Sequence, residues 1–452
     1  MPEAQVSSDD RQFSFEAKTV PLSAIRFNEA IYPRKEGHDP AVVERYAKDI
    51  EQIEAAGALV SIAPDGDLLD GRHRHLAYQT RYAQEPDREI PVKVWDTTGD
   101  ADNRFLAVKL NARHGLAFTD DDRKHSAIGL YNDGYTSPTI AKVLSVSEAT
   151  VSKLLSRTIK EKKDRQNDLI RKLWLACYTN EEIGQAVGET SDAVRMRLKV
   201  TEESLQREVS SVTPHSHDFE VPLYNVWKQQ CKSNAVGHFG NSEARWLDNL
   251  LYLYTEPLDI VVDPFAGGGS TIDVCKKRWR RYWCGDRKPK VSRHAENEAG
   301  GIREHDMVAD DGSIRLPDLR GRWGNVKLVY LDPPYWKQAE GQYSNDPTDL
   351  ANMSLGLFTN TLANIINDFA KKLTSSGGFI AVMLQPTQWN APERTYTDHI
   401  VDVLRKVTLP IEMRFSVPYE SQQCNAQMVE WAKQSRKVLV LSREIVVWRV
   451  AS

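Results

Sequence analysis

The half of the chain from Val221 onwards alternates strand-sized apolar runs with helical stretches, and this alternation most constrains its fold. LDIVVDPF is followed by the helical TIDVCKKRW and then by RYWCGD; later VKLVYL precedes an amphipathic helix and GGFIAVML. Strands that alternate with helices predict a parallel sheet covered by helices on both faces. We therefore predict a doubly wound, Rossmann-like α/β domain over residues 221–452, with a terminal antiparallel hairpin over residues 436–450.

The N-terminal half is predicted to form separate modules, because 452 residues exceed one ordinary core. Residues 1–17 are a polar tail, and the short apolar runs and helical stretches of residues 18–117 predict an α+β domain. Residues 118–200 have few strand signals and contain two similar segments in which a helix, a short helix and a serine-opened helix follow one another. They predict an all-α region of two helix-turn-helix motifs, and the polar residues 201–220 predict a linker. The fold class is thus multidomain.

Composition limits the kinds of partner. The formal net charge is -4, so any surface for nucleic acid must be local. RTIKEKKDRQ, between the two helical motifs, is either such a phosphate contact or a solvated helix face. The chain has neither a membrane-length apolar run nor a signal peptide, so we expect no membrane partner. Five cysteines without CxxC spacing predict no disulfide framework and no metal site, and favour the cytoplasm.

A glycine-rich turn, VVDPFAGGGST, joins a predicted strand to a helix and is a candidate binding site for an electron-rich ligand. It has neither the GK[ST] of a phosphate loop nor GxGxxG spacing. Asp286 ends the next strand, 23 positions after Asp263, where an acid can hold a ribose diol. Asp306 is a candidate partner for an adenine amino group, although both acids could instead be plain strand-end or turn residues. The predicted ligand is a nucleoside held by Asp263, Pro264, Phe265, Ala266, Gly267, Gly269, Ser270, Thr271, Asp286 and Asp306.

The apolar run Val326–Leu331 ends in DPPYW, whose two prolines forbid further strand pairing and fix the backbone beyond it. DPFAGGGST together with DPPYW, in this order, resembles the S-adenosylmethionine-dependent amino-methyltransferases that modify DNA bases. The resemblance covers roughly residues 221–450. Within it, GNSEARWLDNLLYLYTEP corresponds to the family's helical cofactor-side motif and would wall the methionine end of the cofactor. It implies S-adenosyl-L-methionine as cofactor and a catalytic set of Asp332, Pro333, Pro334 and Tyr335.

In that family, the Asp332 carboxylate and the Pro333 carbonyl would accept hydrogen bonds from the base amino group. Tyr335 would stack on a base flipped out of the duplex, and Trp336 would either widen that platform or belong to the core. No cysteine follows a proline, which disfavours cytosine C5 chemistry. Asp at the first position of the motif favours adenine N6, with cytosine N4 as the alternative. The loops ERTYTDH and SVPYESQQCNAQ are either target-recognition segments or plain surface loops.

VPLSAIRFNEAIYPRK and DGDLLDGRHRHLAYQT resemble the ParB/sulfiredoxin-like domain. The resemblance implies phosphate binding at Gly71, Arg72 and Arg74, and hence a nucleotide as a second partner. The turn lacks the GERR form of the partition CTPases, which puts hydrolysis in doubt, and a structural domain with solvated basic residues is the alternative.

The helix-turn-helix pair resembles the region that follows this domain in ParB proteins, and predicts double-stranded DNA as partner. Its candidate base readers are Thr150, Ser152, Lys153, Arg195 and Arg197. Motifs that only pack, or that form a homodimer, remain an alternative. The function predicted is a site-specific DNA (adenine-N6) methyltransferase, and the rival classes are a ParB-like DNA-binding regulator with a non-catalytic methyltransferase fold and an RNA methyltransferase. Restriction, regulatory and phage roles stay open.

Overall fold

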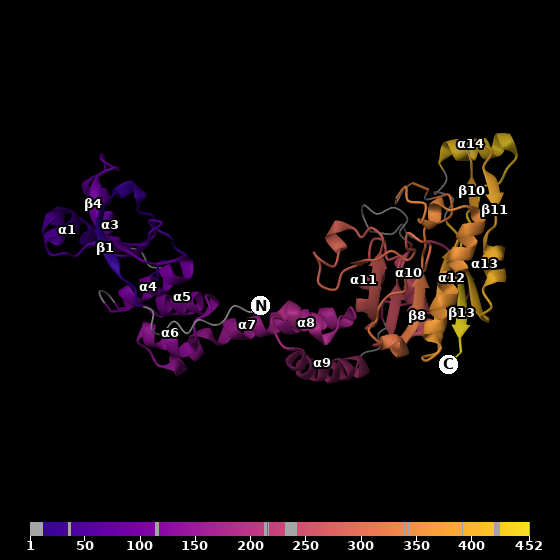
Figure 1. Cartoon of the computed structure of the whole chain (residues 1–452), viewed down its shortest axis with the longest axis horizontal. Helices are drawn as coiled ribbons and strands as arrows, with labels where there is room; N and C mark the ends of the chain where they lie inside the picture. Colours follow the sequence, from indigo (N-terminus) through magenta and orange to yellow (C-terminus); the bar gives the residue numbers. More distant parts are fainter. Residues whose placement is uncertain are drawn as a thin grey trace. The chain divides into compact units, whose positions relative to one another are not determined.

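The computed structural model describes residues 12–34, 38–113, 117–211, 215, 217–230, 242–338, 340–341, 344–390, 392–419 and 425–451. The chain divides into two compact units, residues 1–165 and 166–452 (Figure 1). A mixed α/β multidomain architecture is confirmed. The boundary between the units lies within one helix, α7 (Glu148–Leu175), so the region predicted as helix-turn-helix contributes to both units.

The first unit begins with an α+β body built on a four-stranded sheet. The strand order is β1 (Phe15–Pro21), β4 (Glu89–Trp95), β2 (Val60–Ile62) and β3 (Leu68–Asp70). Only β2 and β4 are parallel. Its helices are α1 (Pro40–Lys48), α2 (Ile50–Ala55), α3 (Arg72–Arg81) and α4 (Asp100–Arg113). Buried side chains from the strands, α1 and α3 form its core, as the alternation of apolar runs predicts.

A three-helix body completes the first unit: α5 (Asp120–Asn132), α6 (Ser137–Leu144) and the beginning of α7. Thr119 forms a capping box with Asp122 at the start of α5, and the Ser147 hydroxyl accepts from the Thr150 amide at 3.2 Å at the start of α7. Apolar side chains of the three helices pack together, including Leu130, Ile140, Leu144, Val151 and Leu155.

The second helix-turn-helix segment belongs to the second unit. The end of α7, α8 (Asn180–Val187) and α9 (Ser191–Ser211) share one core with α10 (Ala244–Tyr254) and the large sheet. Helix α9 continues to Ser211, into the stretch expected to be a linker, because no proline or glycine interrupts it before Pro214.

The large sheet of the second unit has seven strands. Their order is β12 (Ile411–Ser416), β13 (Glu444–Val450), β9 (Gly378–Leu384), β8 (Val326–Leu331), β5 (Ile260–Asp263), β6 (Arg281–Asp286) and β7 (Arg303–Glu304). The strands from β9 to β7 are parallel, and β13 is antiparallel to both of its neighbours. The chain passes from β5 to β6 and β7 on one side and then crosses to β8 on the other, so the strand order reverses between β5 and β8.

Helices cover both faces of this sheet (Figure 1). One face packs against α10 and α11 (Ser270–Lys277), and the other against α12 (Leu355–Leu373) and α13 (Ile400–Lys406). Residues of the central strands are buried on both faces, which explains why they are continuous apolar runs rather than alternating ones.

The expected terminal hairpin over residues 436–450 is wrong. Residues 436–443 form no strand, and β13 pairs instead with β9 and β12. The apolar pattern of KVLVL suggested a strand, but both edges of β13 already have partners, and Val438 is exposed. The first candidate recognition loop, residues 393–399, contains β11 (Thr395–Thr397), which pairs with β10 (Thr387–Trp389). The second, residues 416–427, runs from the end of β12 into α14 (Ala426–Ser435), and its residues 420–424 lie outside the described residues.

Candidate functional site

A cavity of about 950 Å³, including its open mouth, lies at the carboxyl ends of β5, β6 and β8. This is the place where the strand order reverses, and the carboxyl ends of parallel strands at such a reversal form the usual ligand crevice of open α/β sheets. Its lining comes from three parts of the second unit: residues 242–247, residues 263–308 and residues 330–350.

The glycine turn forms one wall of the cavity and is held by Asp263. One carboxylate oxygen of Asp263 accepts from the Phe265 amide at 3.0 Å, and the other from the Thr271 hydroxyl at 2.5 Å. Burial raises the pKa of Asp263 to about 7, against the lowering effect of the Thr271 hydroxyl. Gly269 precedes α11 with a φ of +84°, a left-handed conformation that favours glycine.

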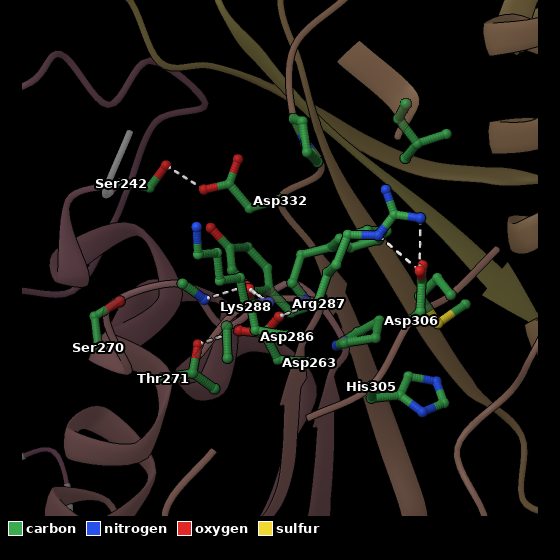
Figure 2. Close-up of a pocket in the computed structure, with 18 of the residues that line it drawn as sticks. Ser242, Asp263, Ser270, Thr271, Asp286, Arg287, Lys288, His305, Asp306 and Asp332 are labelled. Carbon is green, nitrogen blue, oxygen red and sulfur yellow. Dashed lines mark hydrogen bonds and ion pairs between the residues drawn. The ribbon is translucent and has the colours of Figure 1, made fainter. Parts of the chain in front are cut away.

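Asp286, at the end of β6, joins the glycine turn to the next loop. Its oxygens accept from the Gly267 and Lys288 amides, both at 2.9 Å. The carboxylate retains lone pairs for a ligand hydroxyl, since each oxygen has two. Asp306 also lines the cavity and is paired with Arg287 at 2.6 Å, as Figure 2 shows.

Asp332 directly follows β8 and faces Ser242 (Figure 2). The Ser242 hydroxyl donates to one carboxylate oxygen at 2.5 Å, and the Tyr335 hydroxyl donates to the other at 3.1 Å. Burial raises the pKa of Asp332, and it raises the pKa of Tyr335 well above its usual value. Tyr335 therefore remains a protonated donor that fixes the direction of the Asp332 carboxylate.

The structure brings most of the predicted methyl-transfer residues into one cavity. The lining includes Asp263, Pro264, Phe265, Ala266, Gly267, Ser270, Thr271, Asp286, Asp306, Asp332 and Pro334. Gly269, Pro333 and Tyr335 are outside this lining, and Tyr335 packs against the core of the second unit. Trp336 is a core residue: it is buried, and its ring nitrogen donates to the Met353 carbonyl at 2.9 Å.

Ser242 and Glu243 belong to GNSEARWLDNLLYLYTEP, which was expected at the cofactor side without individual contacts. Sequence reasoning missed other lining residues, among them Arg287, Lys288, His305, Thr348 and Asp349. Arg287 and Lys288 directly follow Asp286, so their place at a strand end was a usable signal. Ser242 lies 90 positions before its partner Asp332, and no local pattern connects the two.

The predicted base readers differ in how free their side chains are. Ser152 and Lys153 are exposed on α7, whereas Thr150 is half-buried and its hydroxyl pairs with Ser147 at 2.9 Å. On α9, Arg195 is exposed beside Asp192. Arg197 is held by Glu189 and by Asn167, so an existing pair would have to break before it could reach DNA.

The predicted phosphate turn lies at the start of α3. Gly71 has a φ of +93°, and the Arg72 guanidinium lies 3.1 Å from the centre of the Phe27 ring. The Arg74 guanidinium already forms structural hydrogen bonds, since it donates to Asp70 and to the Leu59 carbonyl, both at 2.9 Å. Of the two arginines, only Arg72 is without an acidic partner among the described residues.

Residues 124–297 match a family model, N6_N4_Mtase, described as DNA methylase. The match covers fewer than half of the residues, includes the glycine turn and Asp286, and ends before Asp332. It supports a DNA methyltransferase without distinguishing adenine N6 from cytosine N4. No curated protein matches the sequence.

Solved structures give weaker likenesses. A putative rRNA-methylase from Clostridium thermocellum is 13% identical, with 45% of this chain and 96% of that chain covered and a TM-score of 0.27. The chromosome-partitioning protein ParB from Caulobacter crescentus, complexed with CTP-gamma-S, is 13% identical over 31% of this chain and 77% of that chain, with a TM-score of 0.18. Such scores carry no structural argument.

Two further observations bear on the type of protein. None of the described helices is both long and apolar enough to cross a membrane. Within the described residues, no group of three or more His, Cys, Asp or Glu side chains is arranged to hold a metal ion.

Proposed function

We propose that the protein is a DNA methyltransferase that transfers the methyl group of S-adenosyl-L-methionine to the N6 amino group of adenine in duplex DNA. The observation that carries the proposal is that one cavity is lined both by the glycine turn and by Asp332 of DPPYW. The DNA methylase match supports the reaction class. The choice of adenine over cytosine N4 rests on the Asp at the first position of DPPYW.

The cavity lining suits this cofactor. Six acids line it, namely Glu243, Asp263, Asp286, Asp306, Asp332 and Asp349, against the cations Arg287 and Lys288. A predominantly acidic wall favours a ligand with a sulfonium and an ammonium group. We propose that Asp286 binds the ribose diol and that the residues around Asp306 receive the adenine ring. When bound, S-adenosyl-L-methionine supplies an electrophilic methyl group on its sulfonium sulfur.

Asp332 is proposed to act on the nitrogen that receives the methyl group. The lone pair of an exocyclic amine is delocalised into the base, so the site must align the nitrogen and stabilise the positive charge that develops on it. The ionised Asp332 carboxylate accepts a hydrogen bond from the amine, as does the Pro333 carbonyl. As the new nitrogen–carbon bond forms and the carbon–sulfur bond breaks, the amine releases one proton to the Asp332 carboxylate.

Ser242 and Tyr335 are proposed to hold the Asp332 carboxylate in place, because each donates to one of its oxygens. Each oxygen keeps a second lone pair for the substrate amine. The Tyr335 ring is proposed to stack on the flipped base, and DNA is proposed to contact Ser152 and Lys153 on α7. A nucleotide phosphate is proposed to contact Arg72 in the first unit.

Methyl transfer from labelled S-adenosyl-L-methionine to duplex DNA and to RNA, followed by nucleoside mass analysis, tests the proposal. We expect N6-methyladenine in duplex DNA with wild type, a loss of at least 100-fold with Asp332→Ala, and wild-type activity with Asp310→Ala, an exposed acid outside the cavity lining. Formation of N4-methylcytosine would contradict the proposal that adenine is the target base. Methylation of RNA but not of DNA would contradict the proposal that duplex DNA is the substrate. DNA binding without any methyl transfer would favour a regulator.

A further inference from the structure

A buried arginine near the candidate site has no acidic partner. Arg443 is 3% exposed, and its Nε and Nη2 atoms have no hydrogen-bond partner. Within the described residues it forms no salt bridge. Burying a charge without an opposite charge costs free energy, so the presence of an unpaired arginine at this position needs an explanation.

The sheet register places Arg443 at the same edge and on the same face as Asp332. Leu331, Val382 and Val446 form one row across β8, β9 and β13. Met383 and Ile445 pair in the next row towards the cavity, and Asp332 directly follows Leu331. Residues opposite one another in a sheet share a face, and so do residues two apart in a strand. Arg443 directly precedes β13 and contacts Trp246 of α10, and Asp332 directly follows β8 and bonds to Ser242 just before α10, so both lie on the face that α10 covers.

Aromatic rings hold the Arg443 guanidinium in place. It lies 3.4 Å from the centre of the Tyr419 ring and 4.5 Å from that of Trp246 in α10. The Tyr419 hydroxyl in turn donates to Gln385, the residue after β9, at 3.0 Å. Such contacts stabilise a cation without neutralising it.

The groups around Asp332 act on its carboxyl in opposite directions. Burial raises its pKa, and the Ser242 hydroxyl, the positive charge of Arg443 and the Tyr335 hydroxyl lower it. The other titratable groups at this edge are Asp263 on β5, Tyr330 on β8 and Tyr419 after β12, and the charge of Asp332 raises the pKa of each of them. Among these groups, Arg443 supplies the positive charge.

We propose that Arg443 is a positioning residue for methyl transfer, whose unneutralised positive charge keeps the half-buried Asp332 carboxylate ionised. The proposal rests on the proposed function of Asp332. Arginine suits this role because it stays protonated even when buried, and because its flat group can stack between rings. A salt bridge to a structural acid would cancel the charge, which explains why none is present among the described residues.

The test compares Arg443→Met and Arg443→Gln with the charge-preserving Arg443→Lys. Arg449→Met is the control, since Arg449 lies on the same strand but is exposed and paired with Glu412. Two quantities are measured: the acidic limb of the kcat profile against pH, and the titration of the Asp332 carboxyl ¹³C resonance in aspartate-labelled protein, assigned with Asp332→Asn.

For the two neutral variants, we expect both the acidic limb and the Asp332 titration to move up by about one pH unit or more. Arg443→Lys and Arg449→Met should stay within a few tenths of a unit of wild type. A folded neutral variant whose Asp332 titration does not move would overturn the proposal and leave Arg443 a purely structural role. The titration needs no activity, so it tests Arg443 even if wild type transfers no methyl group, an outcome that would count only against the proposed function.

Discussion

The backbone of Gly269 makes the glycine turn sensitive to a single methyl group. Its φ is +84°, and a Cβ atom there would lie 2.8 Å from Nε of Arg293. The Nη2 atom of the same arginine donates to the Gly269 carbonyl at 2.9 Å. We expect Gly269→Ala to weaken S-adenosyl-L-methionine binding at least 10-fold and to cost about 1–3 kcal/mol of stability. Calorimetric titration and thermal unfolding measure the two effects. Gly356→Ala is the control, because its Cβ meets nothing within 4 Å at an exposed position of α12.

Asp263 gives the free protein a predictable pH dependence. Its pKa in the folded state, about 7, is above that of an ordinary aspartate because it is buried. The folded state therefore holds a proton that the unfolded state has lost, and the free energy of unfolding falls as pH rises from about 4 to about 7, by at most about 1.4 kcal/mol per unit. Asp263→Asn should flatten this fall in a series of melting temperatures, whereas the exposed Asp310→Asn should not. If the melting temperatures of Asp263→Asn and wild type changed with pH in the same way, Asp263 would not be the cause of the pH dependence.

Among single residues, those with a local sequence pattern were found and those that depend on distant contacts were not. Asp332 was predictable because two prolines after a buried strand mark it, and Asp263 because glycines follow it. The burial of Arg443 was not predictable, because an arginine before an apolar run usually lies at the end of a strand with its side chain in solvent. Its burial depends on Trp246 and Tyr419, which lie elsewhere in the chain.

At the scale of elements, Arg281 connects the end of α7 to the large sheet. Arg281 of β6 donates to the Trp174 carbonyl at 3.1 Å, and its guanidinium lies 4.2 Å from the centre of the Trp174 ring. Arg281→Met should lower the free energy of unfolding of the second unit by about 2–3 kcal/mol, because a buried carbonyl loses its charged donor. Chemical denaturation measures this loss. The exposed Arg207→Met on α9 should stay within about 0.5 kcal/mol, and an equal loss in both variants would contradict the fastening role.

The parallel strands were predictable, but the packing of the second helical motif was not. Runs such as IVV and YWC are apolar on both faces, and this pattern belongs to central parallel strands. The buried faces of α8 and α9 would be equally apolar in a free helix-turn-helix motif. The sequence pattern of Ile183, Val194 and Leu198 therefore cannot tell whether they pack only on α7 or, as in the structure, within the core of the second unit.

At the scale of the whole molecule, the candidate methyl-transfer site lies within one of the two units. Every residue that lines the cavity belongs to residues 166–452, whereas the first unit has cores of its own. A ligand that binds one folded unit stabilises that unit by about 2.7 kcal/mol at 100 times its Kd. We therefore expect calorimetry to resolve two unfolding transitions, of which S-adenosyl-L-methionine raises only one.

The variants identify the transitions. Arg281→Met should lower the same transition that the cofactor raises. Removing the buried Leu130 side chain in Leu130→Ala should lower the other, by about 2–5 kcal/mol. A single transition that both variants lower would mean that α7, which crosses from one unit into the other, couples their unfolding. In that case cofactor binding would also stabilise the first unit, and with it the helix that carries Ser152 and Lys153.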